Sequence, residues 1–369
     1  MSQNNNNDQN TLYAPAAYQA FPFWKTLLKD LILMIVGISF FGFILALIPL
    51  FLIRGCVALG DAGLGGSVDS VDIVETFIDG NKEADAKVVV LPIEGVILSD
   101  TADGSSFWST ALRDIMEDDT VQALVLRTDT PGGTVAGSAY YHRLIKKLKE
   151  EKDIPIIVSM GDLTCSGGYY ISMAADELIA EPSTVTGSIG VICALVNAAE
   201  LCKKLGVSSN AITSGSMKAM GSFMKEPTEE ENAIWQALVD SSYEQFLSVI
   251  RDGRPWFRAE DVEPEEKQKR EEELRKIADG RIYTADQALE LHLIDQIGYL
   301  DDAIDVALER AELDKDAARV VVYAEPEGLL QILGLGVRAN EKPLDKASSI
   351  IETFATPKTY YLCPNALPL

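Results

Sequence analysis

Blocks of β-branched residues alternate with helical periodicity through the middle of the chain. The blocks Lys87–Leu98, Val121–Leu126 and Ile154–Met160 each predict a strand, because they are short, apolar and bounded by turn residues. Between the second and third blocks, apolar residues recur at the spacing of one helix face: Tyr141, Leu144, Ile145 and Leu148. A strand, a helix and a strand at this interval predict parallel pairing through a crossover helix, and therefore an α/β fold.

The longest apolar run lies near the N-terminus, at residues 31–53. It holds 23 residues without a charge, and at ~1.5 Å per residue it is long enough to cross a membrane. A buried core helix is the alternative, but the length of the uncharged run argues against it. Lys25 and Lys29 precede the run and Arg54 follows it, which favours an N-terminus in the cytoplasm and a main domain outside it.

The pattern divides the chain into five parts. These are a polar tail, a transmembrane helix, a linker, an α/β domain and a C-terminal extension, at residues 1–30, 31–53, 54–86, 87–313 and 314–369. Within the domain, the apolar stripe over 228–252 predicts a long helix. The dense charge run at 259–276 predicts a solvated helix.

Composition removes some classes of function. The formal net charge of −24 argues against nucleic acid as a partner, because phosphate binding needs a basic face. None of the five cysteines belongs to a C-x-x-C pair, so we expect no structural zinc site and no other metal. No motif points to a cofactor, and we expect none.

Two glycine turns follow predicted strands, at Thr130–Gly133 and Cys165–Gly168. Both lie where the carboxyl ends of parallel strands gather ligands, and paired glycines expose backbone N–H groups. Ser166 stands in the second turn, before an apparent helix at 167–175. The N–H groups at a helix start stabilise the oxyanion of acyl transfer, which suggests a serine nucleophile. A plain helix cap is the equally simple alternative.

A serine nucleophile needs a base, and the chain holds only two histidines. His142 lies off the apolar stripe of the crossover helix and His292 lies in an apolar stretch, so neither has a reason to reach Ser166. Lysine is the other known partner of serine, but it must lose water and avoid carboxylates to act as a base. Lys218 lies within 201–225, a window without Asp or Glu, although an ordinary surface lysine remains the alternative.

Long ordered motifs in residues 87–310 closely resemble signal peptide peptidase A, a family of bacterial membrane-bound serine proteases with a Ser–Lys dyad. The resemblance is carried by LRTDTPGGTVAGS (126–138), GDLTCSGGYYISMAADELIAEPSTVTGSIGV (161–191), SGSMKAMGS (214–222) and GRIYTADQALELHLIDQIGYLDDAI (280–304). These motifs are correctly spaced for the short, single-module branch of the family. The fold that the resemblance implies is the crotonase-like α/β fold shared with Clp protease subunits.

The resemblance also implies roles for individual residues. Ser166 matches the nucleophile and Lys218 matches the general base. Ser188 matches the serine that hydrogen-bonds and orients the lysine. The backbone N–H groups of Gly133 and Gly167 match the oxyanion hole.

Assembly, substrate and location follow from the same resemblance. It implies a ring-like homo-oligomer, an octamer, in which a neighbouring subunit supplies the lysine. The implied substrates are signal-peptide remnants in the membrane, and the domain would lie on the outer side of the bacterial cytoplasmic membrane, with residues 31–53 in contact with lipid. Cys165 departs from the small residue usual in the family, and we interpret it as a buried apolar neighbour of the nucleophile.

Other functions stay open at this point. The same chemistry could act on a different membrane protein, and a non-catalytic membrane scaffold could keep the fold. A crotonase-type acyl-CoA enzyme is a fold-level option that the predicted anchor and the Ser–Lys pair argue against. The apolar end of the chain, YYLCPNALPL, is expected to pack on the domain, with entry into a substrate groove as the alternative.

Overall fold

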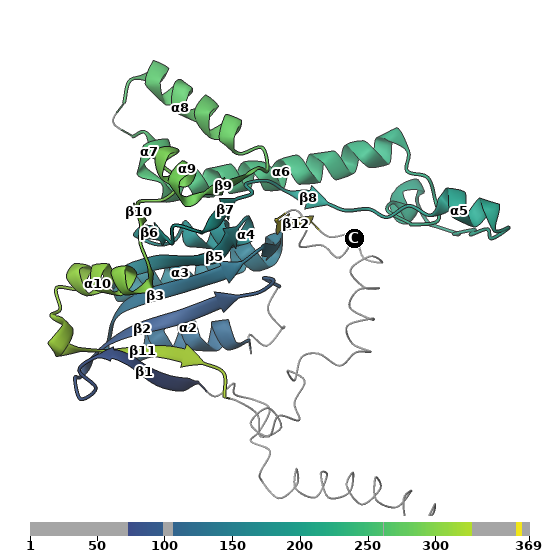
Figure 1. Cartoon of the computed structure of the whole chain (residues 1–369). Helices are drawn as coiled ribbons and strands as arrows, with labels where there is room; N and C mark the ends of the chain where they lie inside the picture. Colours follow the sequence, from purple (N-terminus) through teal and green to yellow (C-terminus); the bar gives the residue numbers. More distant parts are fainter. Residues whose placement is uncertain (1–72, 99–105, 261, 327–358, 364–369) are drawn as a thin grey trace, which may run out of the picture. The chain divides into compact units, whose positions relative to one another are not determined.

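The computed structural model describes residues 73–98, 106–260, 262–326 and 359–363 (Figure 1). Within these ranges no helix has both the length and the apolar character needed to cross a membrane. The predicted tail and transmembrane helix, residues 1–53, lie outside the described ranges.

A mixed sheet forms the centre of the described structure, in the order β1-β11-β2-β3-β5-β6-β10. In chain order, these strands are β1 (Val74–Gly80), β2 (Ala86–Glu94), β3 (Val121–Thr130), β5 (Ile156–Cys165), β6 (Glu177–Ala180), β10 (Gln296–Ile297) and β11 (Ala318–Ala324). The strands from β11 to β10 pair in parallel, and β1 pairs with β11 antiparallel. Beyond the end of β6, the last residues of β5 pair instead with β7 (Val185–Gly187), which also pairs with β9 (Ile282–Thr284).

The described ranges hold five longer helices, which are α2 (Phe107–Glu117), α3 (Val135–Lys152), α6 (Glu229–Gly253), α8 (Pro264–Ile277) and α10 (Leu300–Arg310). Of these, α2, α3 and α10 flank this sheet. Shorter helices are α4 (Gly167–Ser172), α5 (Ala199–Lys204), η2 (Ser216–Ala219), α7 (Pro255–Arg258), α9 (Ala285–Glu290) and η3 (Lys315–Ala317). A small second sheet has the order β4-β12-β8, with β4 at Gly132–Thr134, β8 at Ile192–Cys193 and β12 at Thr359–Leu362.

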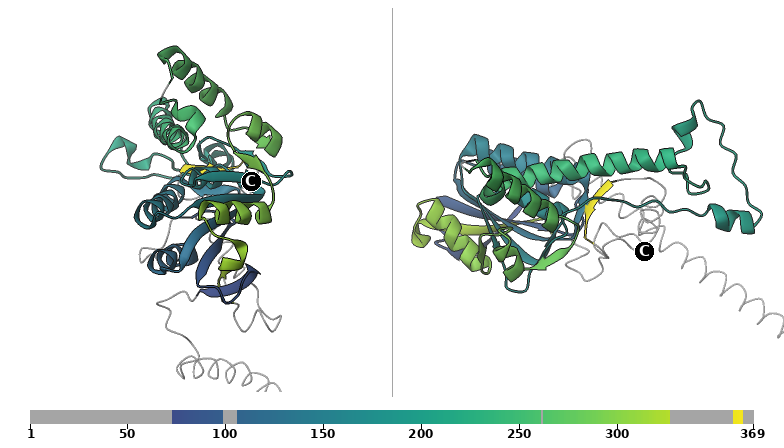
Figure 2. Two further views of the ribbon diagram at one scale, coloured as in Figure 1. Left: turned by 90° about the vertical axis from the view of Figure 1, so that its left-hand side faces the viewer. Right: turned by 90° about the horizontal axis from the view of Figure 1, so that it is seen from above.

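Both faces of the main sheet are buried, because successive side chains of a strand point to opposite faces. In β3, Leu124 and Leu126 join the larger apolar cluster with residues of α2, α3 and α4. Ala123 and Val125 join a second cluster, in which Ile304 and its neighbours on α10 cover the other face. Figure 2 shows α10 and the pair α2 and α3 on opposite sides of the strands.

The predicted strand–helix–strand unit is confirmed, since β3 and β5 pair in parallel and α3 connects them. Both strands run further than predicted, to Thr130 and Cys165, and therefore end directly at the glycine turns. The sheet also extends beyond the predicted domain limits of 87–313, because β1 and β11 complete its edge. The long helix at 228–252 is confirmed as α6. The charge run begins its helix later than predicted, at Pro264, whose fixed φ suits a first helical position.

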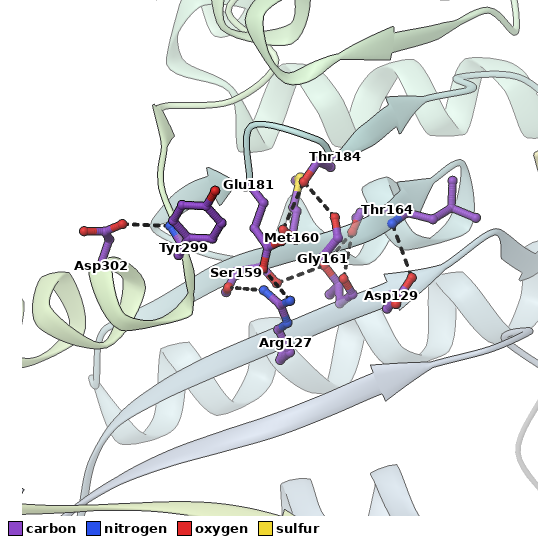
Figure 3. Close-up of polar contacts among 12 residues, drawn as sticks. Arg127, Asp129, Ser159, Met160, Gly161, Thr164, Glu181, Thr184, Tyr299 and Asp302 are labelled. Atoms are coloured by element: carbon purple, nitrogen blue, oxygen red, sulfur yellow. Dashed lines mark hydrogen bonds and ion pairs between the residues drawn. The ribbon is translucent and has the colours of Figure 1, made fainter. Parts of the chain in front are cut away.

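Polar contacts tie the ends of β3 and β5 together below the glycine turns (Figure 3). Arg127 donates to Ser159 Oγ at 2.9 Å and pairs with Glu181 at 2.6 Å. Asp129 accepts the N–H of Leu163 at 3.2 Å. The buried hydroxyl of Thr184, just before β7, donates to the carbonyls of Met160 and Gly161 at 3.1 and 2.7 Å. These bonds hold β3, β5 and β7 in one register, and so hold the turns that follow them.

Candidate active site

The two glycine turns meet at the carboxyl ends of β3 and β5. The strands are parallel neighbours, with Thr130 opposite Thr164. A Cβ on Gly167 would lie 3.0 Å from the backbone nitrogen of Gly133, and a Cβ on Gly132 would lie 2.7 Å from that of Gly167. Only residues without a Cβ allow this approach. The structure therefore brings together the two predicted oxyanion residues, Gly133 and Gly167.

Ser166 occupies a strained turn between β5 and α4. Its φ of 54° and ψ of −111° lie outside the usual regions for a side-chain-bearing residue. Its backbone is fixed, since its N–H donates to the carbonyl of Gly187 and its carbonyl accepts the N–H of Tyr170, both at 2.8 Å. The buried hydroxyl has no hydrogen-bond partner among the described residues and does not cap α4. The helix-cap alternative is therefore wrong.

Ser188 lies beside Ser166. It follows β7, whose Gly187 stands opposite Cys165, and it is almost fully buried. Its φ of 50° places it in the left-handed region directly after Gly187. The backbone N–H of Ser188 donates to the carbonyl of Arg281 at 2.7 Å, which fixes this turn.

Lys218 lies elsewhere, on η2 within the connection between β8 and α6. Its side chain is exposed, and its backbone N–H donates to the carbonyl of Gly215 at 3.1 Å. The residues just after it, among them Ala219, line a cavity of about 220 Å³ together with Glu231 and Trp235 of α6. Lys218 therefore lies beside the N-terminal part of α6.

The opposite part of α6 contacts the turn that holds Ser166. Gln245 donates to the hydroxyl of Tyr170 on α4 at 3.3 Å, whereas Glu231 lies 14 positions earlier on the same helix. At 1.5 Å per residue this separation is about 21 Å. Within one chain the structure does not bring Lys218 to Ser166. Figures 1 and 2 show α5, on the same connection, well away from α4.

Neither histidine takes the place of the lysine. His142 packs edge-on against Tyr170, with the ring centroids 5.3 Å apart, and burial lowers its pKa to about 4. His292 stacks on Trp256 at 4.1 Å. No described side chain lies within hydrogen-bond distance of the Ser166 hydroxyl, so within one chain the predicted nucleophile has no base beside it. No cluster of metal-ligating side chains occurs in the described ranges either.

Cys165 is buried next to Ser166, as we expected. Its thiol lies 3.6 Å from the carbonyl of Val185. Burial first, and then the neighbouring thiol of Cys363, raise its pKa well above the usual range. The thiol is therefore protonated near neutral pH and is a poor nucleophile.

The C-terminal strand β12 runs alongside the glycine turn of β4. It pairs antiparallel with β4, placing Tyr361 opposite Gly133, and antiparallel with β8, placing Tyr360 opposite Ile192. A Cβ on Gly132 would lie 2.2 Å from the carbonyl oxygen of Tyr361 and 2.7 Å from the nitrogen of Gly167. An extended peptide therefore already lies across the oxyanion residues.

The side chain of Tyr361 fills an aromatic pocket that the sequence analysis missed. It stacks on Tyr170 at 5.0 Å and contacts Phe246 at 4.7 Å, and its hydroxyl donates to the carbonyl of Ser242 at 2.8 Å. Ser138 was missed as well; its buried hydroxyl lies 2.4 Å from the position of a Cβ on Gly167. The aromatic run Tyr169-Tyr170 next to the serine turn was the signal that could have indicated the pocket.

Comparison with known proteins matches this chain to one family of peptidases. The sequence model of peptidase family S49 matches residues 146–314. A relative from Enterococcus faecium named "Putative signal peptide peptidase SppA" is 37% identical over 258 residues, covering 68% of this chain and 70% of that protein. A "Putative protease" of Synechocystis sp. is 37% identical over 247 residues, covering 67% of this chain and 82% of that protein.

More distant matches were also found. The chloroplastic serine protease SPPA of Arabidopsis thaliana is 33% identical over 228 residues, covering 61% of this chain and 32% of that protein. The solved structure of a 1510-N membrane-bound stomatin-specific protease aligns with a TM-score of 0.38 and 16% identity, over 65% of this chain and 99% of that one.

Proposed function

This chain belongs to peptidase family S49 and is a serine protease of the SppA type, and from that premise we propose a membrane-anchored endopeptidase with Ser166 as nucleophile and Lys218 as general base. The observation that carries the proposal is the combination of a strained backbone and an unpartnered hydroxyl at Ser166. Its hydroxyl is buried and unpartnered among the described residues, in a strained turn between the N–H groups of Gly133 and Gly167. A structural serine would satisfy its hydroxyl and would not need the strain.

The peptide substrate binds as an extended strand. Where β12 now pairs with β4 and β8, a substrate backbone would find the same hydrogen-bonding edges. Its scissile carbonyl would then lie beside Gly133 and Gly167, as the carbonyl of Tyr361 does. The substrate class that fits this site and the name of the relative is an apolar membrane peptide, such as a signal-peptide remnant.

The base comes from a second copy of the chain. Lys218 is exposed, and it lies beside a part of α6 that is about 21 Å along the helix from the part that contacts α4, so its own chain leaves Ser166 without a base. Docking a neighbour over Ser166 would strip water from its Lys218 amine, which disfavours the cationic form. Ser188, next to Ser166, would accept a hydrogen bond from this amine and orient it.

Catalysis then follows the steps of acyl transfer. The neutral Lys218 amine takes the proton of the Ser166 hydroxyl as the oxygen attacks the peptide carbonyl. The N–H groups of Gly133 and Gly167 donate to the oxyanion that forms. The lysine returns the proton to the leaving amine, and a water molecule then releases the acyl group from Ser166.

Complementation between two inactive variants tests this arrangement. Ser166→Ala or Lys218→Ala alone should lower peptide cleavage by at least about 10³-fold without changing the unfolding temperature. Co-expression of the two variants with different tags should restore about one quarter of the wild-type activity in mixed oligomers, because a random ring places an intact serine beside an intact lysine that often.

The matched control is Lys204→Ala, an exposed lysine on the same connection, which should keep full activity. Mixed oligomers that stay inactive would show that the lysine acts within its own chain or not at all. A serine-reactive fluorophosphonate that fails to label Ser166 in wild-type oligomers would favour a non-catalytic scaffold instead.

A further inference from the structure

Two thiols meet where β12 passes the nucleophile. Cys363 directly follows β12, and its backbone N–H donates to the carbonyl of Pro131 at 2.8 Å. Cys165 directly precedes Ser166. The carbonyls of Cys165 and Tyr361 lie 3.1 and 2.2 Å from one point, the position of a Cβ on Gly132, so the two backbones run within a few ångströms of each other.

The two side chains are neighbours as well. After burial, the Cys363 thiol is the group that raises the pKa of the Cys165 thiol, and both cysteines are free. The other free cysteines in the described ranges are placed differently: Cys193 stands opposite Thr359 at the far end of β12, and Cys202 lies on α5. Cys165 and Cys363 are therefore the described cysteines that lie on neighbouring backbone segments, which is the first requirement for a disulfide.

We propose that Cys165 and Cys363 form a reversible disulfide that fastens residues 359–363 across the oxyanion residues and closes the site to peptides. The proposal rests on the proposed function, because it takes the place between β4 and β8 as the peptide-binding site. In the reduced protein β12 is held by hydrogen bonds and by the buried side chains of Tyr360 and Tyr361, without a covalent link beside Ser166, so a peptide can displace it.

The oxidant is a small-molecule disulfide such as glutathione disulfide. The more exposed thiol of Cys363 loses its proton and attacks one sulfur of that disulfide, which releases one thiol and leaves a mixed disulfide on Cys363. The Cys165 thiol, which stays protonated on its own, then passes its proton to the departing sulfur as it attacks the Cys363 sulfur, which releases the second thiol; burial of Cys165 makes this the slow step. One external disulfide thus becomes two thiols, while the two protein thiols become one disulfide.

Closure follows from where the bond would lie. In the reduced protein a peptide displaces β12 when the strand dissociates from β4 and β8. With a covalent link beside Ser166, the same displacement would require the disulfide to break. An intramolecular strand at a high effective concentration then outcompetes added peptide by at least about tenfold. The disulfide would also lie close to the reacting hydroxyl, because Cys165 directly precedes Ser166, the proposed nucleophile.

The test uses the full-length protein in detergent, treated with glutathione disulfide or with dithiothreitol. Peptide mapping by mass spectrometry should find Cys165 linked to Cys363 only after oxidation. The variant Ser166→Ala should then bind a fluorescent peptide with the sequence of residues 359–362 at least about tenfold more weakly when oxidised than when reduced. Dithiothreitol should restore binding.

Two variants sharpen the result. Cys363→Ser should remove the response to glutathione disulfide, whereas Cys202→Ser should keep it. Oxidised protein without the Cys165–Cys363 link, or linked protein that binds the peptide as tightly as reduced protein, would overturn the proposal. Because the link and the binding are both measured without catalysis, a failure of the proposed function would be seen separately, as reduced wild-type protein that cuts no peptide.

Discussion

The turn around Ser166 and the connection around Lys218 are built in different ways. Every residue from Thr164 to Ala175 is buried, and the backbone of Ser166 is bonded on both sides. In the connection between β8 and α6, residues 194–228, Ala199 is the only buried residue. Large apolar side chains stand exposed there, with Leu205 at 69% and Ile212 at 96% of full exposure.

This difference teaches which half of the site a single chain can build. A strained serine turn persists only where its surroundings over-determine it, and β4, α4 and β7 do so. An exposed connection with apolar side chains is stabilised by what covers it, and isolated chains leave it uncovered. The turn of Ser166, the proposed nucleophile, is therefore complete within the fold, whereas Lys218, the proposed base, lies on a segment whose exposed apolar surface suits a second copy.

One methyl group added to each region should give very different effects, and the largest is expected at Gly133, beside the serine turn. In Gly133→Ala the new Cβ would lie 1.8 Å from the carbonyl oxygen of Ile97, which is backbone and cannot move aside. We expect a loss of about 3 kcal/mol in the free energy of unfolding, together with loss of peptide cleavage. Chemical denaturation of the purified protein measures the first, and a peptide assay measures the second.

Gly215→Ala is the matched change in the Lys218 connection. Nothing lies within 4 Å of its Cβ position and its φ is −155°, so any residue fits. We expect a change of no more than about 0.5 kcal/mol. Equal effects at Gly133 and Gly215 would contradict the contrast between a packed turn and an open connection.

A smaller effect should appear on acidification, through His142 beneath the serine turn. Burial lowers its pKa to about 4, from an ordinary value near 6.5. The unfolded chain therefore binds more protons between these pH values, and the stability present above pH 6.5 is lost as the pH falls toward 4. Allowing for partial exposure of the ring, denaturation at pH 5 should give about 1.5 kcal/mol less stability than at pH 7.

His142→Phe is the control for this prediction. Phenylalanine keeps a ring against Tyr170 but cannot take up a proton, so the loss of stability between pH 7 and pH 5 should shrink. If the variant loses as much stability as the wild type over this range, other groups cause the pH dependence.

Local sequence predicted the turn that holds Ser166 well because the signal is local. Ser166 stands between paired glycines at the end of an apolar strand, and the parallel pairing of β3 with β5 follows from the strand–helix–strand pattern. The position of Lys218 along the chain was equally visible, through the acid-free window around it. Its distance from Ser166 in one chain was not, because that depends on where a 25-residue helix, α6, points.

The role of the C-terminus was the least predictable part. The four residues of β12 are too few to show a periodicity, and they pair with β4 more than 200 positions earlier. Such pairing is decided by tertiary contacts, here the pocket that Tyr170 and Phe246 offer to Tyr361. The proximity of Cys165 and Cys363 follows from this pairing and could not be derived from cysteine spacing.

The smallest expected effect tests the open side of the comparison. Leu205→Glu places a charge on the most exposed leucine of the connection, so the free chain should keep its stability within about 0.5 kcal/mol. If a second copy covers this connection, burial of the carboxylate should weaken self-association about fivefold, equivalent to ~1 kcal/mol. Sedimentation of the two proteins at matched concentrations measures this, with Val74→Glu, an exposed apolar position on β1, as the control. Equal association of both variants would mean that copies meet elsewhere, and Lys218 would then have no route to a neighbouring Ser166.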